Sequence, residues 1–256
     1  MNVLKMCIIS VLAMLISYNA DAEIRRKLVE RKCDFNREVC IANLNILLNS
    51  FLAMQAKGVA YAVKDLDSGK IVAQEYMSNA KINYLENYEY IGLETTQFIN
   101  VILGLNYGII SVNDLNENRL DFKDNSKAND ELLFKLKLMP QRSTPLEYLE
   151  MYSEFIQNPK LKDILPVLHN KIEKGFLSYM KVKGVDMYGF ADFSTDDEVG
   201  TVYMFIGHFE KNNKRYAIVS VVDSPEKAIK FEKSKKSIKN SNYLASALIE
   251  AIAKNM

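Results

Sequence analysis

The sequence has few histidines and cysteines, and this scarcity limits the metal and redox chemistry that it can support. It contains two histidines, His169 and His208, and three cysteines. The carboxylates nearest to the histidines, Glu173 and Glu210, would add at most one ligand to each, whereas a metal centre needs several. We therefore predict no metal site, and we expect no other cofactor.

An excess of one charge is also missing. The 33 basic and 32 acidic residues give a formal net charge of +1, so the chain has no general attraction to a polyanion. Nucleic acid is therefore not an expected partner. At 256 residues, 48% hydrophobic and 25% charged, the composition is that of an ordinary globular protein that can bury a substantial core.

The apolar run near the start is too short to cross a bilayer. Met6–Ile16 falls well below the roughly 20 residues that a spanning helix needs. Lys5 precedes this run and Ala20-Asp21-Ala22 follows it, a pattern typical of a secretory signal. We expect residues 1–22 to be a signal peptide whose cleavage releases an exported chain. The alternative is an uncleaved leader, which would be the only contact with a membrane.

Loss of the leader removes Cys7 and leaves Cys33 and Cys40. An even pair in an exported chain can form a disulfide. If residues 30–54 form one continuous helix, however, the seven-residue spacing rises about 10 Å, which is too far for a bridge. We therefore predict two reduced or partly buried thiols. A bridge would require residues 34–36 to interrupt the helix.

Four segments have the periodicity of amphipathic helices, with apolar residues at steps of three and four. The second of them opens with a Ser/Thr cap and a proline. They are Arg37–Ala56, Ser143–Asn158, Asp163–Tyr179 and Asn240–Asn255. The highly charged stretch Glu23–Lys32 before the first predicts a helical or loose lead-in.

A fifth helix is expected near the middle of the chain. No charge occurs from Thr95 to Val112, and the apolar residues cover every face of a helical period, which indicates a buried helix. Gly92 and the polar residues after it mark the start, and Asn106-Tyr107-Gly108 marks the end.

Strands are predicted near both ends of the chain. Residues 58–73 alternate and contain the turn Asp67-Ser68-Gly69, which indicates a β-hairpin. Val199–Ile206 and Tyr216–Val222 form a second pair of strands. Strands at both ends imply one sheet, against which the first and last helices pack.

No internal repeat or Pro/Gly-rich linker divides the chain after the leader. We therefore predict a single α+β domain over residues 23–256. Its sheet lobe covers about 37–80 and 181–256, and a helical lobe of about 81–180 is inserted between these two parts.

Four segments resemble the transpeptidase domain of penicillin-binding proteins and the related serine β-lactamases. They are the hairpin GVAYAVKDLDSGKIVA at 58–73, LNYGIIS at 105–111, the helix start TPL at 144–146, and VYMFIGHF at 202–209 with the strand after it. The resemblance covers about residues 40–256. It implies a β-lactamase-like fold with an antiparallel sheet, flanking helices and a reduced helical lobe.

The first catalytic motif of that family is not retained. In Ser-x-x-Lys the serine attacks an acyl carbonyl and the lysine takes its proton. The resemblance places Glu94 and Gln97 at these two positions. A carboxylate is a poor acyl acceptor and a glutamine cannot act as a base. Neither Thr95 nor Thr96 has a lysine three residues later.

The other two motifs are altered as well. Ser111-Val112-Asn113 spells the family's Ser-x-Asn, but it falls at the end of the central helix, and Ser126–Asn129 is one residue too long. The resemblance sets Phe190, Ala191 and Asp192 on Lys-Thr-Gly, which binds the substrate carboxylate in the family. Apolar and acidic side chains thus replace a positive clamp, and like charges in a cleft oppose the binding of an anion.

We hypothesise an exported, catalytically inactive relative of these transpeptidases that acts as a binding or scaffold module in cell-wall assembly. The expected partners are cell-wall synthesis proteins or peptidoglycan peptides. An acyltransferase or hydrolase with a relocated nucleophile, Ser111, Ser126 or Ser143, is one alternative. A secreted partner-binding domain unrelated to the wall is another.

Glu94 has two interpretations of its own. The simpler is a carboxylate that stabilises the dipole of the central helix. The other is a pair of carboxylates formed with Asp192, as in glycoside hydrolases.

Overall fold

A computed structural model describes residues 28–79, 82–90, 93–106, 108, 111, 113, 143–174, 177–196, 200–224 and 231–256. The predicted signal peptide at 1–22 and the candidate Ser126 lie outside these residues. In the part that is described, no helix is long and apolar enough to cross a membrane.

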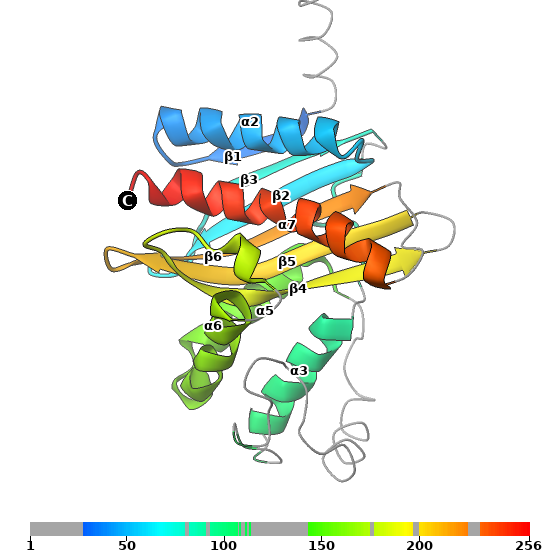
Figure 1. Cartoon of the computed structure of the whole chain (residues 1–256). Coiled ribbons are helices and arrows are strands. Elements are labelled where there is room, and N and C mark those ends of the chain that lie inside the picture. The colour runs from blue at the N-terminus through cyan, green and yellow to red at the C-terminus, as the bar shows by residue number, and fades with distance from the viewer. Residues whose placement is uncertain are drawn as a thin grey trace, which may run out of the picture.

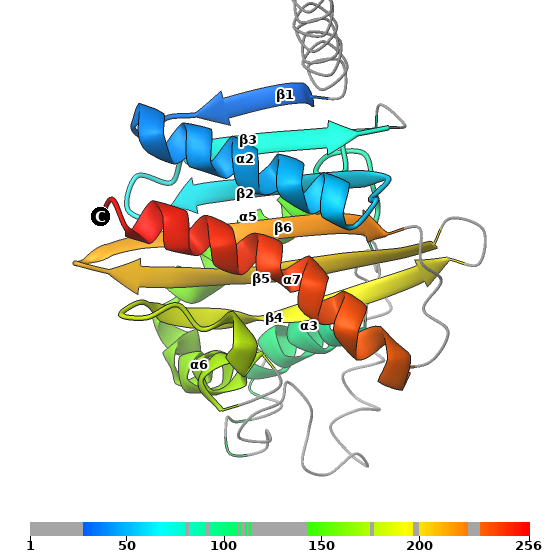
Figure 2. The same ribbon diagram turned by 45° about the horizontal axis from the view of Figure 1, so that its top comes forward.

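One antiparallel sheet of six strands forms the centre of the molecule (Figures 1 and 2). The strands follow the order β1-β3-β2-β6-β5-β4, so β2 and β6 join the N-terminal half to the C-terminal half. This arrangement confirms the predicted α+β class and the sheet built from both ends. The strands are β1 (Leu28–Cys33), β2 (Gly58–Asp65), β3 (Ile71–Ser78), β4 (Asp186–Asp196), β5 (Gly200–Lys211) and β6 (Lys214–Ser224).

Helices cover both faces of the sheet (Figure 1). The first and last helices, α2 (Arg37–Ala53) and α7 (Phe231–Ala253), lie side by side on one face, as the sequence predicts. The opposite face carries α3 (Leu93–Asn106), α5 (Pro145–Gln157) and α6 (Leu165–Glu173). Two short 3₁₀ helices, η2 (Pro159–Ile164) and η3 (Ser178–Met180), flank α6.

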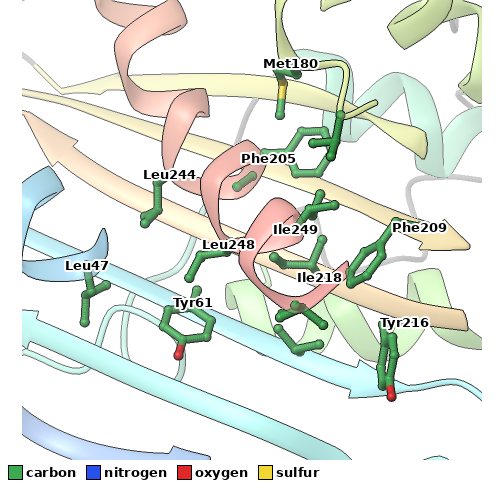
Figure 3. Packing of buried hydrophobic residues seen from close by; sticks show 14 of the residues in the cluster. Leu47, Tyr61, Met180, Phe205, Phe209, Tyr216, Ile218, Leu244, Leu248 and Ile249 are labelled. Atoms are coloured by element: carbon green, nitrogen blue, oxygen red, sulfur yellow. The ribbon is translucent and has the colours of Figure 1, made fainter. Parts of the chain in front are cut away.

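Each layer has its own apolar core. Between the sheet and the α2/α7 layer, Leu47, Tyr61 and Leu248 belong to a buried cluster in which side chains from both helices meet those of the strands (Figure 3). On the other face, a second cluster joins Phe98 of α3 and Tyr152 of α5 to the sheet. Burial on both faces explains why the central strands read as nearly continuous apolar runs.

The start of the described chain differs from the prediction. Leu28–Cys33 is a strand paired with β3, rather than a helical or loose lead-in. The side chain of Asn36 accepts a hydrogen bond from the N–H of Val39 and caps α2 at its first turn. The continuous helix that would separate the two cysteines therefore does not exist.

Cys33 and Cys40 form a disulfide, with their Cα atoms 5.8 Å apart. The prediction of two free thiols was wrong because the strand ends at Cys33 and the cap at Asn36 turns the chain back along it. Arg31 adds a second link between β1 and α2, since its guanidinium donates to the carbonyl of Cys40 at 2.9 Å.

Removal of this disulfide should destabilise the protein moderately. A bridge between residues seven apart closes a short loop, and the loss of such a loop costs about 2.5 kcal/mol in the chain-entropy account. We expect Cys33→Ser together with Cys40→Ser to lower the free energy of unfolding by this amount in urea titrations. The reduced native protein is the matched control and should behave like the double variant. An unchanged urea midpoint would contradict the prediction.

Two helices differ from their predicted bounds. α6 spans Leu165–Glu173 and is shorter than the predicted Asp163–Tyr179, because Pro166 suits only a first turn and Gly175 disfavours continuation. α7 starts at Phe231, earlier than predicted. By contrast, α5 begins as expected, with a complete capping box between Thr144 and Glu147.

Candidate functional site

The first turn of α3 meets the middle of β4, so the structure brings together two of the three predicted site elements. The N–H and the hydroxyl of Thr95 both donate to Oδ2 of Asp192, at 2.8 Å each. The other oxygen of Asp192 accepts from the N–H of Phe193 at 2.8 Å. Thr95 and Asp192 are 1% and 6% exposed. Asp192 therefore acts as a buried cap that offers a negative charge to the N-terminus of α3.

Phe190 fills the space beside this cap. It is 1% exposed, and its ring centroid lies 4.8 Å from that of Phe98 on α3. Ala191, between Phe190 and Asp192, packs into the core on the other face of the sheet, as the alternation of a strand requires. The side chains at the positions compared with Lys-Thr-Gly thus take part in packing and helix capping.

Two tyrosines surround Asp192. Tyr90 is fully buried, and burial followed by the charge of Asp192 raises its pKa well above the ordinary value. Burial, together with the nearby carboxylates, raises the pKa of Tyr148 to about 12. The Tyr148 hydroxyl donates to the carbonyl of Tyr90 at 3.1 Å. At neutral pH both phenols are protonated, so neither serves as a base.

Glu94 and Gln97 lie in the first turns of α3, close in sequence to Thr95, which contacts Asp192. Their side chains lie outside the described part of the structure, so the suggested pairing of Glu94 with Asp192 stays a prediction. The carboxylate found at the helix start is that of Asp192, which reaches α3 from β4. Both of its oxygens accept hydrogen bonds, which suits a structural group better than a proton donor.

Two of the candidate serines, Ser111 and Ser143, are among the residues that the structure describes. Ser111 follows the C-terminal end of α3 and is exposed, and the 14 residues of this helix rise about 20 Å from the end that Asp192 caps. Ser143 is 9% exposed, and its carbonyl accepts from the N–H of Tyr90 at 3.0 Å. Ser111 thus lies toward the other end of α3 from Asp192, whereas the backbone of Ser143 contacts Tyr90, one of the two tyrosines beside Asp192.

Ser143 does line an open pocket of about 640 Å³. The described residues of its lining are mainly acidic and apolar: Glu86, Ser143, Thr144, Leu146, Glu147, Glu150 and Met151. Glu147 is held by Thr144 in the capping box, and Glu150 pairs with Lys64. Two of the three glutamates in this lining are therefore already engaged with other groups.

A buried polar group around His208 was not predicted as a unit. His208 is 2% exposed, and its Nδ1 lies 2.9 Å from the hydroxyl of Tyr152. Its Nε2 lies 3.5 Å from the Glu210 carboxylate, and its ring stacks on that of Tyr188. Both ring nitrogens have partners, so we interpret His208 as a structural histidine. No group of three metal-binding side chains occurs among the residues that the structure describes.

The burial of His208 should make stability depend on pH. Burial lowers the pKa of His208 in the folded state, and the hydrogen bond from His208 lowers that of Glu210. Below about pH 6.5 the histidine becomes protonated in the unfolded state but stays neutral in the folded state. Proton binding therefore stabilises the unfolded state relative to the folded one. We therefore expect the free energy of unfolding to fall as the pH drops below this value, in urea titrations between pH 7.5 and 5.5.

The matched variants separate this effect from other titrations. His208→Asn should lose stability at pH 7.5, and its deficit relative to the native protein should shrink as the pH falls. His169→Asn, at a half-buried position on α6, removes the like charge that helps to lower the pKa of His208, so in NMR titrations the pKa of His208 should rise slightly toward its ordinary value. A deficit that grows at low pH would show that His208 is charged in the folded protein.

Comparisons with known proteins were made for both sequence and structure. No protein-family model matches the sequence, and no curated protein matches it. Several solved structures match the fold. The transpeptidase domain of penicillin-binding protein 3 from Burkholderia pseudomallei superposes with a TM-score of 0.65 at 12% identity, over 88% of this chain and 96% of that domain.

Two further structures agree with it. The transpeptidase domain of the D,D-transpeptidase FtsI4 from Legionella pneumophila gives a TM-score of 0.58 at 11% identity, covering 88% of this chain and 98% of that one. The class D β-lactamase FUS-1 from Fusobacterium nucleatum gives 0.53 at 14% identity, covering 81% and 97%. The chain therefore has the fold of penicillin-binding transpeptidase domains and class D β-lactamases, as the sequence motifs predict.

Proposed function

We propose that the protein is an exported, catalytically silent transpeptidase-like domain that serves as a binding or scaffold module in peptidoglycan assembly. The fold supports the transpeptidase-like domain in this proposal, since solved transpeptidase domains share the fold over most of the chain. The disulfide supports export, because disulfides persist in oxidising compartments.

The observation that supports a loss of catalysis is that Asp192 caps helix α3 and Phe190 packs in the core. A substrate carboxylate would meet a buried negative charge at Asp192 where the resembling enzymes present a lysine motif. The carboxylate of Asp192 already accepts the two hydrogen bonds from Thr95. Phe190 packs on Phe98 beside it. These contacts offer a substrate carboxylate an acidic and an apolar side chain in place of a positive one, which supports the proposed loss of catalysis.

Penicillin labelling tests this proposal directly. We expect the folded protein to form no covalent adduct with a fluorescent penicillin, as read by intact mass, under conditions that label an active transpeptidase fully. A cooperative melt confirms that the unlabelled protein is folded. A stable adduct would refute catalytic silence, and peptide mapping would then identify the nucleophile, with Ser111, Ser126 and Ser143 as the first serines to replace by alanine.

The proposed partners are cell-wall synthesis proteins or peptidoglycan peptides. Affinity purification from the cell envelope, with mild crosslinking, should recover wall-synthesis enzymes in amounts that exceed those of other envelope proteins. Recovery of partners without any link to the wall would instead favour a secreted binding domain of another kind.

A further inference from the structure

The open pocket of about 640 Å³ beside the start of α5 has no role in the proposed function. Its described lining comes from Glu86, in the segment between β3 and α3, and from the residues that precede and form the first two turns of α5. The volume falls within the roughly 300–1,000 Å³ of small-molecule sites in proteins. The chemistry of the lining therefore decides which kind of ligand fits.

The lining offers several free hydrogen-bond acceptors. Glu86 is exposed, and its carboxylate makes no hydrogen bond or ion pair with the described chain. The hydroxyl of Ser143 likewise has no hydrogen-bond partner in the described structure. Glu147 uses Oε2 to accept from the N–H and the hydroxyl of Thr144, at 2.7 and 3.1 Å, so its Oε1 keeps its lone pairs. Three side chains thus present acceptors to one pocket.

Ser143 is the residue that points to a ligand. A buried hydroxyl normally finds a hydrogen-bond partner, because the loss of its bonds to water is costly. Ser143 is only 9% exposed and lines the pocket. Its carbonyl accepts from the N–H of Tyr90 at 3.0 Å, which fixes the residue at the pocket wall. A ligand in the pocket would supply the partner that its hydroxyl lacks.

Donors for an anion are not available at the start of α5, where a helix would ordinarily supply them. The N–H of Leu146 donates to the carbonyl of Leu85 at 3.1 Å. The N–H of Glu147 donates to Oγ1 of Thr144 at 3.3 Å. The capping box therefore closes this helix end to an anion, and its glutamate adds negative charge to the pocket.

The charge of the described lining is negative overall. Lys64 donates to Glu150 and neutralises it, whereas Glu86 and Glu147 have no basic partner among the described residues. A divalent metal ion would need several convergent oxygen ligands. No group of three metal-binding side chains occurs in the described part of the chain. The lining therefore favours an organic cation.

We propose that this pocket binds a primary ammonium group on a short apolar stem. An ammonium has three N–H donors, and the pocket offers acceptors on Glu86, Ser143 and Glu147. Leu146 and Met151 supply apolar wall for the methylene groups of the stem. Free alkylamines and the lysine side chains of peptides both carry such a group. The proposal does not depend on whether the compared motif positions on α3 and β4 are catalytically silent.

Titration of the folded protein with n-pentylammonium, followed by NMR of its backbone amides, tests the site. The amides of Glu86, Ser143 and Met151 should shift and saturate, with a Kd on the order of millimolar for so small a ligand. n-Pentanol has the same stem without the charge and should bind about tenfold more weakly. N-acetyl-L-lysine amide separates the two sources: binding tighter than that of n-pentylammonium identifies a peptide side chain, and weaker binding identifies a free amine.

Variants of the lining locate the ammonium. Glu86→Gln should weaken the binding of n-pentylammonium about fivefold, as expected for an exposed ion pair. Ser143→Ala should weaken it by about the same factor, because it removes a neutral acceptor. Glu154→Gln makes the same change of charge at an exposed position of α5 outside the described lining. It is the matched control and should bind like the native protein.

Several results would overturn the proposal. Equal affinity for n-pentanol would mean that the pocket recognises only the apolar stem. Shifts that do not saturate, or that lie away from the pocket, would show that no site exists there. Unchanged binding by either Glu86→Gln or Ser143→Ala would place the ammonium elsewhere. Equal losses in Glu86→Gln and Glu154→Gln would indicate only a general attraction between a cation and an acidic surface.

Discussion

Asp192→Ala is expected to lower the free energy of unfolding by about 2–4 kcal/mol. The substitution leaves the N–H and hydroxyl of Thr95 buried without their acceptor, and it removes the negative charge at the start of α3. Asp192→Asn keeps one acceptor oxygen for Thr95 but loses the charge and the acceptor for the N–H of Phe193, so its loss should be smaller, about 1–2 kcal/mol. Urea titrations of the native protein and both variants at pH 7 provide the measurement.

The same variants distinguish a structural carboxylate from a catalytic one. Carboxylates held at active sites for chemistry are commonly kept at a cost in stability, so their removal leaves a protein unchanged or more stable. If Asp192→Ala matched or exceeded the native stability, the helix-cap interpretation would be wrong. The paired carboxylates Glu94 and Asp192 would then become the leading hypothesis, with saccharide hydrolysis as the activity to assay.

Four of the six strands, β2, β3, β5 and β6, could be predicted from the sequence because their signal is local. In each of the two hairpins two short apolar runs flank a polar turn, and this pattern reveals the strands. The pairing of the N-terminal strands with the C-terminal strands, through β2 and β6, was inferred only from the expected fold class. The register of that pairing, Gly58 opposite Asp223, had no sequence signal that we could use.

The contacts at the candidate site were not predictable in the same way. Asp192 and Thr95 are separated by 97 residues, and nothing near either residue indicates that they meet. The resemblance placed both near one cleft but assigned Asp192 to repulsion of an anion, not to capping a helix. His208 carried a partial signal, since alternation along β5 places it on the same face as the buried Ile206 and Met204.

The disulfide was missed although a local signal for it exists. Asn36 is a strong N-cap residue and Glu38 follows in the first turn, which together predict a helix that begins at Arg37. The apolar period also placed the start of the helix at Arg37, and the assumption that the helix continued back to residue 30 disregarded this cap. With a helix that begins at Arg37, the bridge would have been within reach. A single capping side chain thus decided whether the two cysteines could meet.

Phe98→Ala is expected to have the largest effect on stability, a loss of about 3–5 kcal/mol. Phe98 is 3% exposed, and its ring packs on Tyr152 at 5.5 Å, Phe155 at 5.0 Å and Phe190 at 4.8 Å. It therefore joins α3 to both α5 and β4. Thermal and urea unfolding give the total loss. Amide hydrogen exchange should show α3 losing protection well before the strands of the sheet.

Phe98→Leu is the matched control, because it keeps most of the volume and should cost about 1.5 kcal/mol. Combining Phe98→Ala with Asp192→Ala should cost less than the sum of the single losses, by about 1 kcal/mol, since both hold the same helix on the same strand. Strict additivity would mean that the ring cluster and the helix cap act independently. In that case the altered motif positions on β4 would not form one structural unit, and the physical basis for a closed, silent site would be lost.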